Sequence, residues 1–501
     1  MGVNAPAMEM SMLLETDVLI PWILAMVFGI FVGSTPGLTA TMAVALIIPI
    51  TYHMPPAAAV AMVIGVSFTA IFAGDIPATY LRIPGTPASA AATLDGHQLA
   101  LQGKGKEALL VNLFCSSIGG LIGVGILIFS APLLARFALS FSFFETFWLC
   151  LLGLALGIVV SSDRLTAAIM ATFLGVLFST VGGDIVSNQP RYTLGYDALL
   201  PGIQFIPAMI GLFGVSEVLR NIQSGDHTSR FTAVPQERGG SWRALLVILK
   251  YPRTVIQSAL TGTVIGALPG AGADVAAWGA YGLAKKTSRN PDEIGKGSIE
   301  GVIAPTSANN AAVGAAWIPA LVFGIPGDAV TAIVLGAFTL YNIPIGQALF
   351  EGPDAQAPVI FTIALATQFL LIPAGLCGIF AFSYVMKVPR RILMVSVLVF
   401  SVIGAYALNN QLLDIGVMLA FGALGFVFER NRIPLPPLIL GIILGPKVEN
   451  SLRAGLTSFS GEISPMFTRP ICSVLVMILA LVILLPIIRA ATEAAGIDVE
   501  T

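Results

Sequence analysis

Four polar side chains lie together in a long apolar part of the sequence. No Asp, Glu, Lys or Arg stands between Glu300 and Asp328, and within this stretch Pro305 is followed closely by hydroxyl and amide groups. These groups belong to Thr306, Ser307, Asn309 and Asn310. Their oxygens are hard neutral ligands for a small cation, and they can also hydrogen-bond a substrate. The alternative is that they join helices inside a membrane, at about 0.6 kcal/mol each. We favour a substrate or ion site at an interrupted helix.

A second polar group lies near the start of the chain, where proline and glycine again interrupt an apolar run. Its members are Ser34, Thr35, Pro36, Gly37 and Thr39. Pro removes a backbone donor and Gly permits non-helical conformations, so both leave backbone N–H and C=O groups free. Carriers use such groups, because half-helix N-termini face anions and unwound carbonyls bind cations. We predict substrate or ion binding here, with an ordinary packed kink as the alternative. The candidate sodium ligands of both groups are Thr39, Ser307, Asn309 and Asn310.

Charged residues inside membrane stretches are functional candidates by default. Asp75 and Arg82 are seven residues apart, which places them on one face of a helix. Either they pair with each other, or Arg82 contacts an anionic substrate as a bidentate donor. Asp328 directly follows Gly327, where it either caps the next helix or belongs to the site.

The interruptions occur twice and in the same order. Residues 33–40 (GSTPGLTA) resemble residues 266–273 (GALPGAGA), and the IPG of 83–85 recurs at 325–327. Apolar segments interrupted by Gly and Pro at matching places in two halves indicate a secondary transporter, with its site near the bilayer midplane. This pattern adds to the predicted site Pro84, Gly85, Pro269, Gly270, Gly272, Pro326 and Gly327.

The composition indicates an integral membrane protein. Of 501 residues, 56% are hydrophobic and only 10% are charged, against about 25% charged residues in soluble domains. Residues 18–74 contain no Asp, Glu, Lys or Arg, which is enough for two membrane helices of roughly 20 residues. The long apolar runs do not alternate as barrel strands do. We therefore predict an all-α fold with about ten to thirteen transmembrane helices, some broken or re-entrant.

The chain divides into four predicted parts. These are a first membrane repeat (1–220), a cytoplasmic linker (221–253), a second membrane repeat (254–446) and a C-terminal segment with a last transmembrane helix (447–501). The cytoplasmic assignment rests on six basic residues against three acidic ones in 217–253, following the positive-inside rule. The stretch 95–106 is interpreted as a loop, because no GxxxxGK[ST] phosphate-binding motif occurs.

The motifs resemble those of one known family. The runs PGLTATMAVALIIPIT (36–51) and IPGTPASAAATLDGHQLALQGKGKEAL (83–109) are similar to the large permease subunit of tripartite tricarboxylate transporters, the TctA type. In the second half the similarity covers GALPGAGADVAAW (266–278), KGSIEGVIAP (296–305) and IPALVFGIPG (318–327), together with the ANNA of 308–311. The resemblance adds Thr86 to the predicted site.

The resemblance implies a function and partners. A TctA-type protein imports organic carboxylates across the bacterial inner membrane, driven by an ion gradient, often of sodium, and it contains two inverted repeats. It works with a small TctB-type membrane subunit and a periplasmic TctC-type substrate-binding protein. We therefore expect Na⁺ or H⁺ as the coupling ion, no cofactor and a small organic anion as substrate. Homo-oligomers fit this picture, and a net charge of −2 gives no reason to expect a nucleic-acid partner.

This chain departs from the family pattern at several places, including Asp75, Arg82 and Asp328, which stand where the family usually has small or uncharged residues. We therefore expect a substrate other than citrate. A stand-alone ion-coupled organic anion carrier is the main alternative, and a channel suits paired broken helices less well. An enzyme is not expected, because neither HExxH nor GxSxG occurs.

Overall fold

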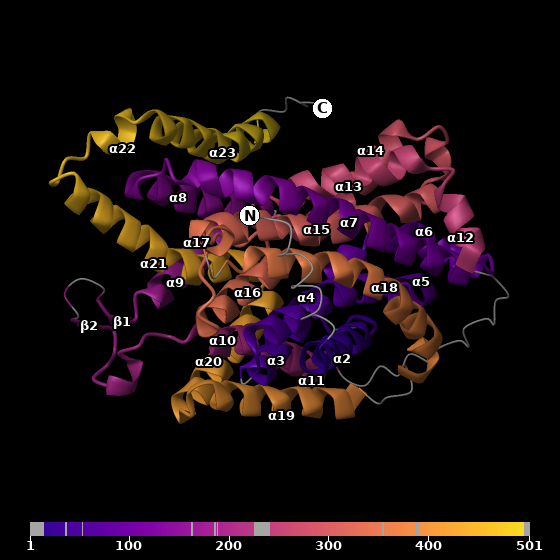
Figure 1. The fold of residues 1–501 in the computed structure, drawn as a ribbon, viewed down its shortest axis with the longest axis horizontal. Helices are drawn as coiled ribbons and strands as arrows, with labels where there is room; N and C mark the ends of the chain where they lie inside the picture. Colours follow the sequence, from indigo (N-terminus) through magenta and orange to yellow (C-terminus); the bar gives the residue numbers. More distant parts are fainter. Residues whose placement is uncertain are drawn as a thin grey trace.

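The computed structural model shows a helical protein (Figure 1). It describes residues 15–494 except Pro36, Gly37, His53, 162–163, 185–186, 188, 225–240, 353–354 and 386–389. The predicted site residues Pro36 and Gly37 therefore lie outside the described residues, as does most of the predicted linker. The helices of the first half are α2 (Thr16–Gly33), α3 (Ala40–Thr51), α4 (Pro56–Ala73), α5 (Asp75–Leu81), η1 (Pro87–Ser89), α6 (Ala92–Leu101), α7 (Gly105–Ala138), α8 (Phe143–Ser161), α9 (Leu165–Ser179), η2 (Asp197–Leu199), α10 (Phe205–Met209), η3 (Ile210–Val215) and α11 (Ser216–Ser224).

The second half follows in similar order. Its helices are α12 (Ser241–Ile248), α13 (Pro252–Gly266), α14 (Gly272–Thr287), η4 (Pro291–Glu293), α15 (Ile299–Phe323), α16 (Ala329–Leu340), α17 (Gln347–Phe350), α18 (Ala357–Val385), α19 (Arg390–Asn409), α20 (Leu412–Arg430), α21 (Leu435–Ser458), α22 (Pro465–Thr468) and α23 (Pro470–Ala494). In the described residues the strands are β1 (Gly182–Gly183) and β2 (Pro190–Arg191), which pair antiparallel with Gly182 opposite Arg191.

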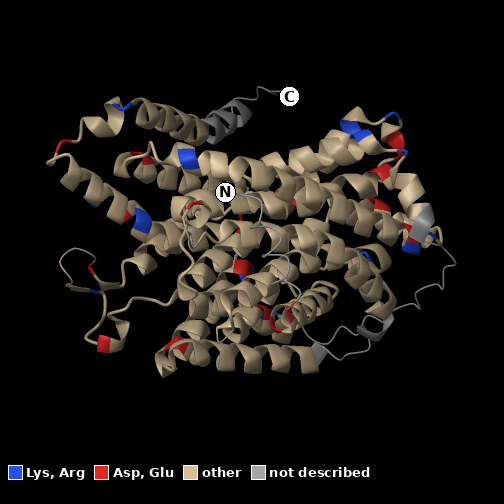
Figure 2. Ribbon diagram, in the orientation of Figure 1, with Lys and Arg blue, Asp and Glu red and all other residues tan. Residues whose placement is uncertain are grey.

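Eight helices in the described part of the chain are long and apolar enough to cross a membrane. They span Thr16–Gly33, Pro56–Leu81, Gly105–Ala138, Phe143–Val160, Phe205–Gln223, Ala357–Phe382, Ile392–Asn409 and Leu412–Arg430. Shorter apolar helices are α3, α9, α16 and the Pro470–Leu484 part of α23. Charged residues gather toward the two ends of the long axis, and few lie in the middle (Figure 2). The predicted all-α integral membrane fold is confirmed.

The first half is held together by backbone contact between α2 and α4. An added Cβ at Gly29 would lie 3.0 Å from the carbonyl oxygen of Val66, and one at Gly33 would lie 2.2 Å from that of Ala70. Real Cβ atoms do not approach a backbone oxygen as closely as at Gly33, and a Cβ at Gly29 would also lie 2.3 Å from the Thr69 hydroxyl, so both positions favour glycine. Small residues allow such close approach of membrane helices, where packing rather than the hydrophobic effect drives association.

The second half repeats this contact between α13 and α15. An added Cβ at Gly262 would lie 2.3 Å from the carbonyl oxygen of Ala308, and one at Gly266 would lie 2.4 Å from that of Ala312. The two glycines stand 233 positions after their counterparts in α2, and the two alanines stand 242 positions after theirs in α4. These are the offsets at which the PG and IPG motifs recur, which supports the division into two repeats.

The two halves also interlock. α7 of the first half packs along α15 of the second, and α18 of the second half packs along α4 of the first. α21 packs against α8 and α9, while α20 packs against α10, η3 and α11. Each half therefore buries its central helix against a long helix of the other half, which places α4 and α15 at the centre of the molecule (Figure 1).

A buried carboxylate fixes the start of α15. Asp95, which is fully buried, accepts hydrogen bonds from the backbone N–H groups of Gly295, Gly297 and Ser298 at 2.7–2.9 Å and from the Tyr281 hydroxyl at 2.9 Å. A negative charge at this end of a helix also interacts favourably with the helix dipole. The interpretation of 95–106 as a loop is wrong for its first part, because α6 continues to Leu101 and presents Asp95 to a partner far along the chain.

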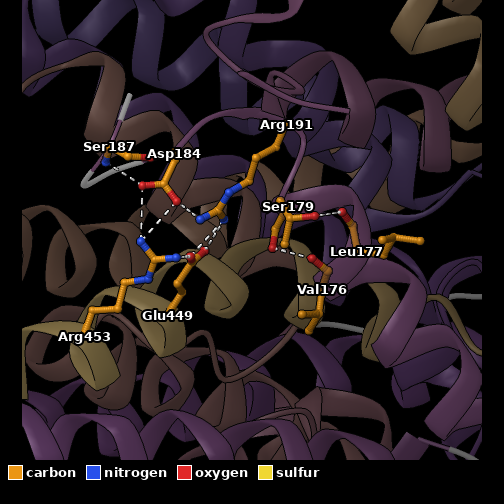
Figure 3. Close-up of polar contacts among 9 residues, drawn as sticks. Val176, Leu177, Ser179, Asp184, Ser187, Arg191, Glu449 and Arg453 are labelled. Carbon is orange, nitrogen blue, oxygen red and sulfur yellow. Dashed lines mark hydrogen bonds and ion pairs between the residues drawn. The ribbon is translucent and has the colours of Figure 1, made fainter. Parts of the chain in front are cut away.

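Charged side chains also fix the opposite end of the molecule, where the β1–β2 hairpin lies against α21 (Figure 3). Arg191 pairs with Asp184 and with Glu449, the latter at 2.9 Å. Arg453 pairs with the same two carboxylates at 3.1 and 2.8 Å. Each cation thus contacts both anions, and a network of this kind holds a loop better than isolated surface pairs do. The predicted boundary between 446 and 447 falls inside α21.

The part of the linker that the structure describes contains a packed helix. α12 lies against α7, with Ala244 and Ile248 buried. The centre of the predicted linker, residues 225–240, lies outside the described residues.

We predict that Asp95→Ala strongly destabilises the protein. The substitution removes the acceptor of four donors, of which the Tyr281 hydroxyl is buried, and a hydrogen bond to a charged group contributes about 1.5–3 kcal/mol. The expected loss in the free energy of unfolding is therefore about 3 kcal/mol or more, measured by thermal melting of the purified protein in detergent. Asp292→Ala, in the exposed η4 turn, is the control and should melt like wild type. Equal melting of the two variants would show that Asp95 does not fix α15.

Candidate functional site

The first interruption brings two distant segments together. α2 ends at Gly33 and α3 begins after Thr39, whose side chain accepts a hydrogen bond from the N–H of Met42 at 3.2 Å. The IPG turn folds back onto this break: the N–H of Gly85 donates to the carbonyl of Gly74 at 3.0 Å. An added Cβ at Gly85 would lie 2.2 Å from the carbonyl oxygen of Gly33. The PG and IPG segments of the first half are therefore in backbone contact.

The second interruption has the same arrangement. The N–H of Gly270 donates to the carbonyl of Gly327 at 2.8 Å. Gly270 has a φ of +82°, a conformation that residues with a side chain rarely adopt. An added Cβ at Gly327 would lie 2.7 Å from Ala316 Cα, just as one at Gly85 would lie 2.8 Å from Gly74 Cα. The two predicted breaks of this half are thus confirmed and meet each other.

The predicted interruption at Pro305 is wrong. α15 runs without a break from Ile299 to Phe323 and contains both Pro305 and Pro319. α15 packs against α7 and α13 at positions where glycine lets backbones touch, including Gly119 against Ser307. This packing keeps the helix continuous through Pro305, as neighbouring helices often do in membrane proteins. The TSANN cluster therefore lies on a continuous helix.

A cavity of about 310 Å³ lies where the breaks of the two halves meet. Its wall includes the N-terminal ends of α3, α14, α16 and α21 and the start of η1. The residues from these ends are Thr39, Ala40, Thr41, Thr86, Pro87, Ala88, Gly270, Ala271, Gly272, Ala273, Asp274, Asp328, Ala329, Val330, Pro434, Leu435 and Pro436. Helix N-termini carry the positive end of the dipole, so their convergence favours a bound anion, while Thr39 and Asp328 already accept the N–H groups of Met42 and Thr331.

Three carboxylates also line this cavity. Asp328 caps α16, accepting from the Thr331 N–H at 2.7 Å, which is the predicted capping role. Asp274 lies beside it in the first turn of α14 and is open to the cavity. Glu429 is paired with Arg220 at 3.6 Å. The cavity therefore combines helix ends that attract an anion with side chains that attract a cation.

A second polar group is buried beside the first IPG turn. Asp75 is fully buried, and the polar side chains next to its carboxylate are Ser89, Asn112 and Asn309. Within the described residues neither carboxylate oxygen has a partner in good hydrogen-bond geometry, and the groups that interact with the carboxylate are these neutral side chains. Arg82 does not supply one, because it is exposed at the left-handed turn that ends α5, with a φ of +58°. The alternative that Asp75 and Arg82 pair with each other is therefore wrong.

The structure divides the predicted site residues among three environments. Those that line the cavity are Thr39, Thr86, Gly270, Gly272 and Asp328. Asp75 and Asn309 belong to the buried polar group, and Ser307 and Asn310 are fully buried without a hydrogen-bond partner in the described structure. The remaining side chains bond within their own helix or face outward: Ser34 and Thr35 donate to Phe31, Thr306 donates to Val302, and Arg82 and Pro84 are exposed.

Sequence reasoning missed several residues of these two sites. Asp274 follows the PGAG motif by two positions, and this nearness could have identified it. Asn112 stands in an apolar run of α7 and Glu429 in the charged end of α20, and nothing in the local sequence connects either residue to a break.

We predict that Gly85→Ala separates the two breaks of the first half. Its Cβ would collide with the backbone oxygen of Gly33, which cannot move aside as a flexible side chain would. Overpacking costs about 1–3 kcal/mol, so thermal melting should show a clear loss of stability. The control is Gly125→Ala in α7, where an added Cβ meets nothing within 4 Å and helix propensity improves. Wild-type melting of Gly85→Ala would contradict the contact.

Comparison with known proteins agrees with this geometry. The sequence model of the tripartite tricarboxylate transporter TctA family matches residues 19–440. The "Uncharacterized 52.8 kDa protein in TAR-I ttuC' 3'region" of Agrobacterium vitis is 33% identical over 493 residues, covering 96% of both chains. The "Uncharacterized protein in TAR-II ttuC' 3'region" of the same organism is 34% identical over 246 residues, which is 47% of this chain and 99% of the relative. No solved structure matches. The chain is a multi-pass membrane transporter component and belongs to the TctA family of tripartite tricarboxylate transporters.

Proposed function

We propose that the chain is the large permease subunit of a binding-protein-dependent secondary transporter, which imports an organic carboxylate driven by a sodium or proton gradient. Its proposed location is the bacterial inner membrane. The proposed partners are a small TctB-type membrane subunit and a periplasmic TctC-type binding protein. The observation that carries the proposal is the cavity at the meeting point of the breaks, into which four helices direct their N-terminal ends.

The cavity suits a small anion in size and in polarity. Ligand sites typically measure about 300–1,000 Å³ and contain a few polar groups in an apolar wall. Here the apolar wall includes Ile71, Phe213 and Ile433, and the polar groups come from helix ends and hydroxyls such as Thr39 and Thr86. Backbone N–H groups at helix N-termini hydrogen-bond carboxylate groups without a basic side chain.

The acidic side chains explain why a cation should accompany the substrate. Asp274 and Asp328 lie next to each other in the cavity wall. An organic anion beside two carboxylates is repelled unless a cation or a proton reduces the negative charge. Import of the anion together with Na⁺ or H⁺ meets this requirement, which favours symport over uniport.

The distribution of charge supports an orientation. The end that carries α6, α12 and the α14–η4 turn contains basic residues such as Lys104, Lys250, Lys285 and Lys286 (Figure 2). By the positive-inside rule this end faces the cytoplasm. The opposite end, with the hairpin and α21, then faces the periplasm, where a substrate-binding protein would deliver its ligand.

The proposal is tested by uptake into proteoliposomes. The chain is reconstituted with its small subunit, the binding protein is added outside, and labelled mono-, di- and tricarboxylates are offered with and without sodium or pH gradients. Gradient-dependent uptake that needs the binding protein is the expected result. Uptake without the binding protein would favour a stand-alone carrier, and the absence of uptake for every carboxylate would contradict the proposal.

We predict that Asp274→Asn lowers uptake at limiting cation concentration by about tenfold or more. One unit charge at close range is worth several kcal/mol at an effective dielectric constant of about 20, and about 1.4 kcal/mol is a tenfold effect. The matched control is Asp197→Asn, an exposed carboxylate in η2. Uptake that has the same cation dependence in Asp274→Asn and wild type would exclude Asp274 from coupling.

A further inference from the structure

Asp75 lies in an unusual setting for a carboxylate. It begins α5, directly after the Gly74 bend that separates α5 from α4, and its relative exposure is 0%. Asn112 of α7 and Asn309 of α15 lie next to it, with exposures of 1% and 0%. α5, α7 and α15 thus each contribute one oxygen-bearing side chain to a region that excludes water. Ser89 of η1 supplies a hydroxyl beside the same carboxylate.

These groups are not satisfied by the protein itself. Among the described residues, both oxygens of Asp75, both polar atoms of Asn309 and the Nδ2 of Asn112 lack a partner in good hydrogen-bond geometry, and the neutral side chains of Ser89, Asn112 and Asn309 are the groups that interact with the carboxylate. Buried polar groups are nearly always paired, and an isolated buried charge is far more costly than an isolated amide. In the described residues no cationic side chain forms an ion pair with Asp75. The neighbours of Asp75 are therefore all neutral, and a cation from outside the chain would supply the missing charge.

We propose that Asp75, Asn112 and Asn309, together with Ser89, bind one sodium ion. The carboxylate supplies the neutralising charge, and amide and hydroxyl oxygens are hard ligands that suit a small cation without d-electron preferences. The side-chain amides can turn their oxygens toward the ion, because their orientation follows the hydrogen-bond partners they find. This site differs from the set predicted from sequence, since it contains Asp75 and Asn112 and not Thr39.

The described part of the second half has no counterpart of this site. At the offset of 242 that relates α4 to α15, the counterpart of Asp75 is Trp317 and the counterpart of Asn309 is Ser67. The Ser67 hydroxyl donates to the carbonyl of Val63 in its own helix. The second half therefore has no equivalent carboxylate, and the unpaired charge is not a requirement of the repeated fold.

One hydrogen bond connects this site to the cavity. The hydroxyl of Thr86, which lines the cavity, is 2.9 Å from the hydroxyl of Ser89. An added Cβ at Gly74 would lie within 2.6 Å of both hydroxyl oxygens, so Thr86 and Ser89 are held against the residue that precedes Asp75. An ion that orders Ser89 also orders Thr86 in the cavity wall. The sodium site itself stands on the buried geometry, and its role as the coupling site rests on the proposed function.

The test measures sodium binding without transport. The purified full chain is melted in detergent across a series of NaCl concentrations, with choline chloride keeping the ionic strength constant and with the pH fixed. A ligand that binds only the folded state raises the melting temperature with its concentration. The melting temperature of wild type should rise with sodium concentration, and that of Asp75→Asn should not. In choline alone Asp75→Asn should melt at or above the wild-type temperature, because it removes an uncompensated buried charge.

A second variant and a control complete the design. Asn309→Ala should keep a sodium-dependent rise but shift its midpoint to at least tenfold higher sodium concentration. Asp414→Asn is the matched control, because Asp414 is equally buried but accepts a hydrogen bond from Asn409 at 2.8 Å. The melting temperature of Asp414→Asn should rise with sodium concentration as much as that of wild type.

Three results would overturn the sodium site: no rise in wild type, a rise that persists in Asp75→Asn, or a stabilisation by acid instead of sodium that Asp75→Asn removes. The last result would make Asp75 a proton site. The proposed function fails separately, if no carboxylate is taken up while sodium binding is intact.

Discussion

Close backbone contact around α15 is the constraint on which the rest of the structure depends. Gly262 and Gly266 of α13 press on one side of α15, and Gly119 and Gly123 of α7 press on another. No larger side chain fits at these positions, so the three helices lie at the minimum distance that backbones allow. This contact keeps α15 helical through Pro305, and it holds Asn309 beside Asp75 deep in the protein.

The cavity and the buried polar group follow from the same geometry. Around the cavity the chain leaves the helical path at its Gly and Pro interruptions. Those interruptions meet within each half, through Gly85 with Gly33 and through Gly270 with Gly327. Helices that start at such points direct their N-terminal ends into one shared space, and α3, α14 and α16 do so here. The polar groups of the cavity thus lie where the helices are interrupted.

Much of this could be predicted from sequence, because the strongest signals are local. Long uncharged runs identify membrane helices, and the recurring PG and IPG motifs mark four of the breaks as well as residues of the cavity such as Thr39 and Asp328. The wrong or missing predictions have a common cause. Whether Pro305 breaks a helix, or whether Asp95 lies in a loop, depends on neighbours hundreds of residues away in the chain. Asn112 has no local signal at all, since its role comes only from its position opposite Asp75.

Charged side chains hold both ends of α15. Asp95 receives the N–H groups at its start, and the ammonium of Lys447 donates to the carbonyl of Gly324 at its end, at 2.8 Å. Charges from α6 and α21 thus clamp a helix whose sides are already locked by glycine contacts. Such a helix resists bending. In alternating access, α15, α7 and α13 should therefore move as one rigid body. The displacement must then be taken up by backbone rotation at the broken segments. One of these is the turn where the N–H of Gly270 donates to the carbonyl of Gly327.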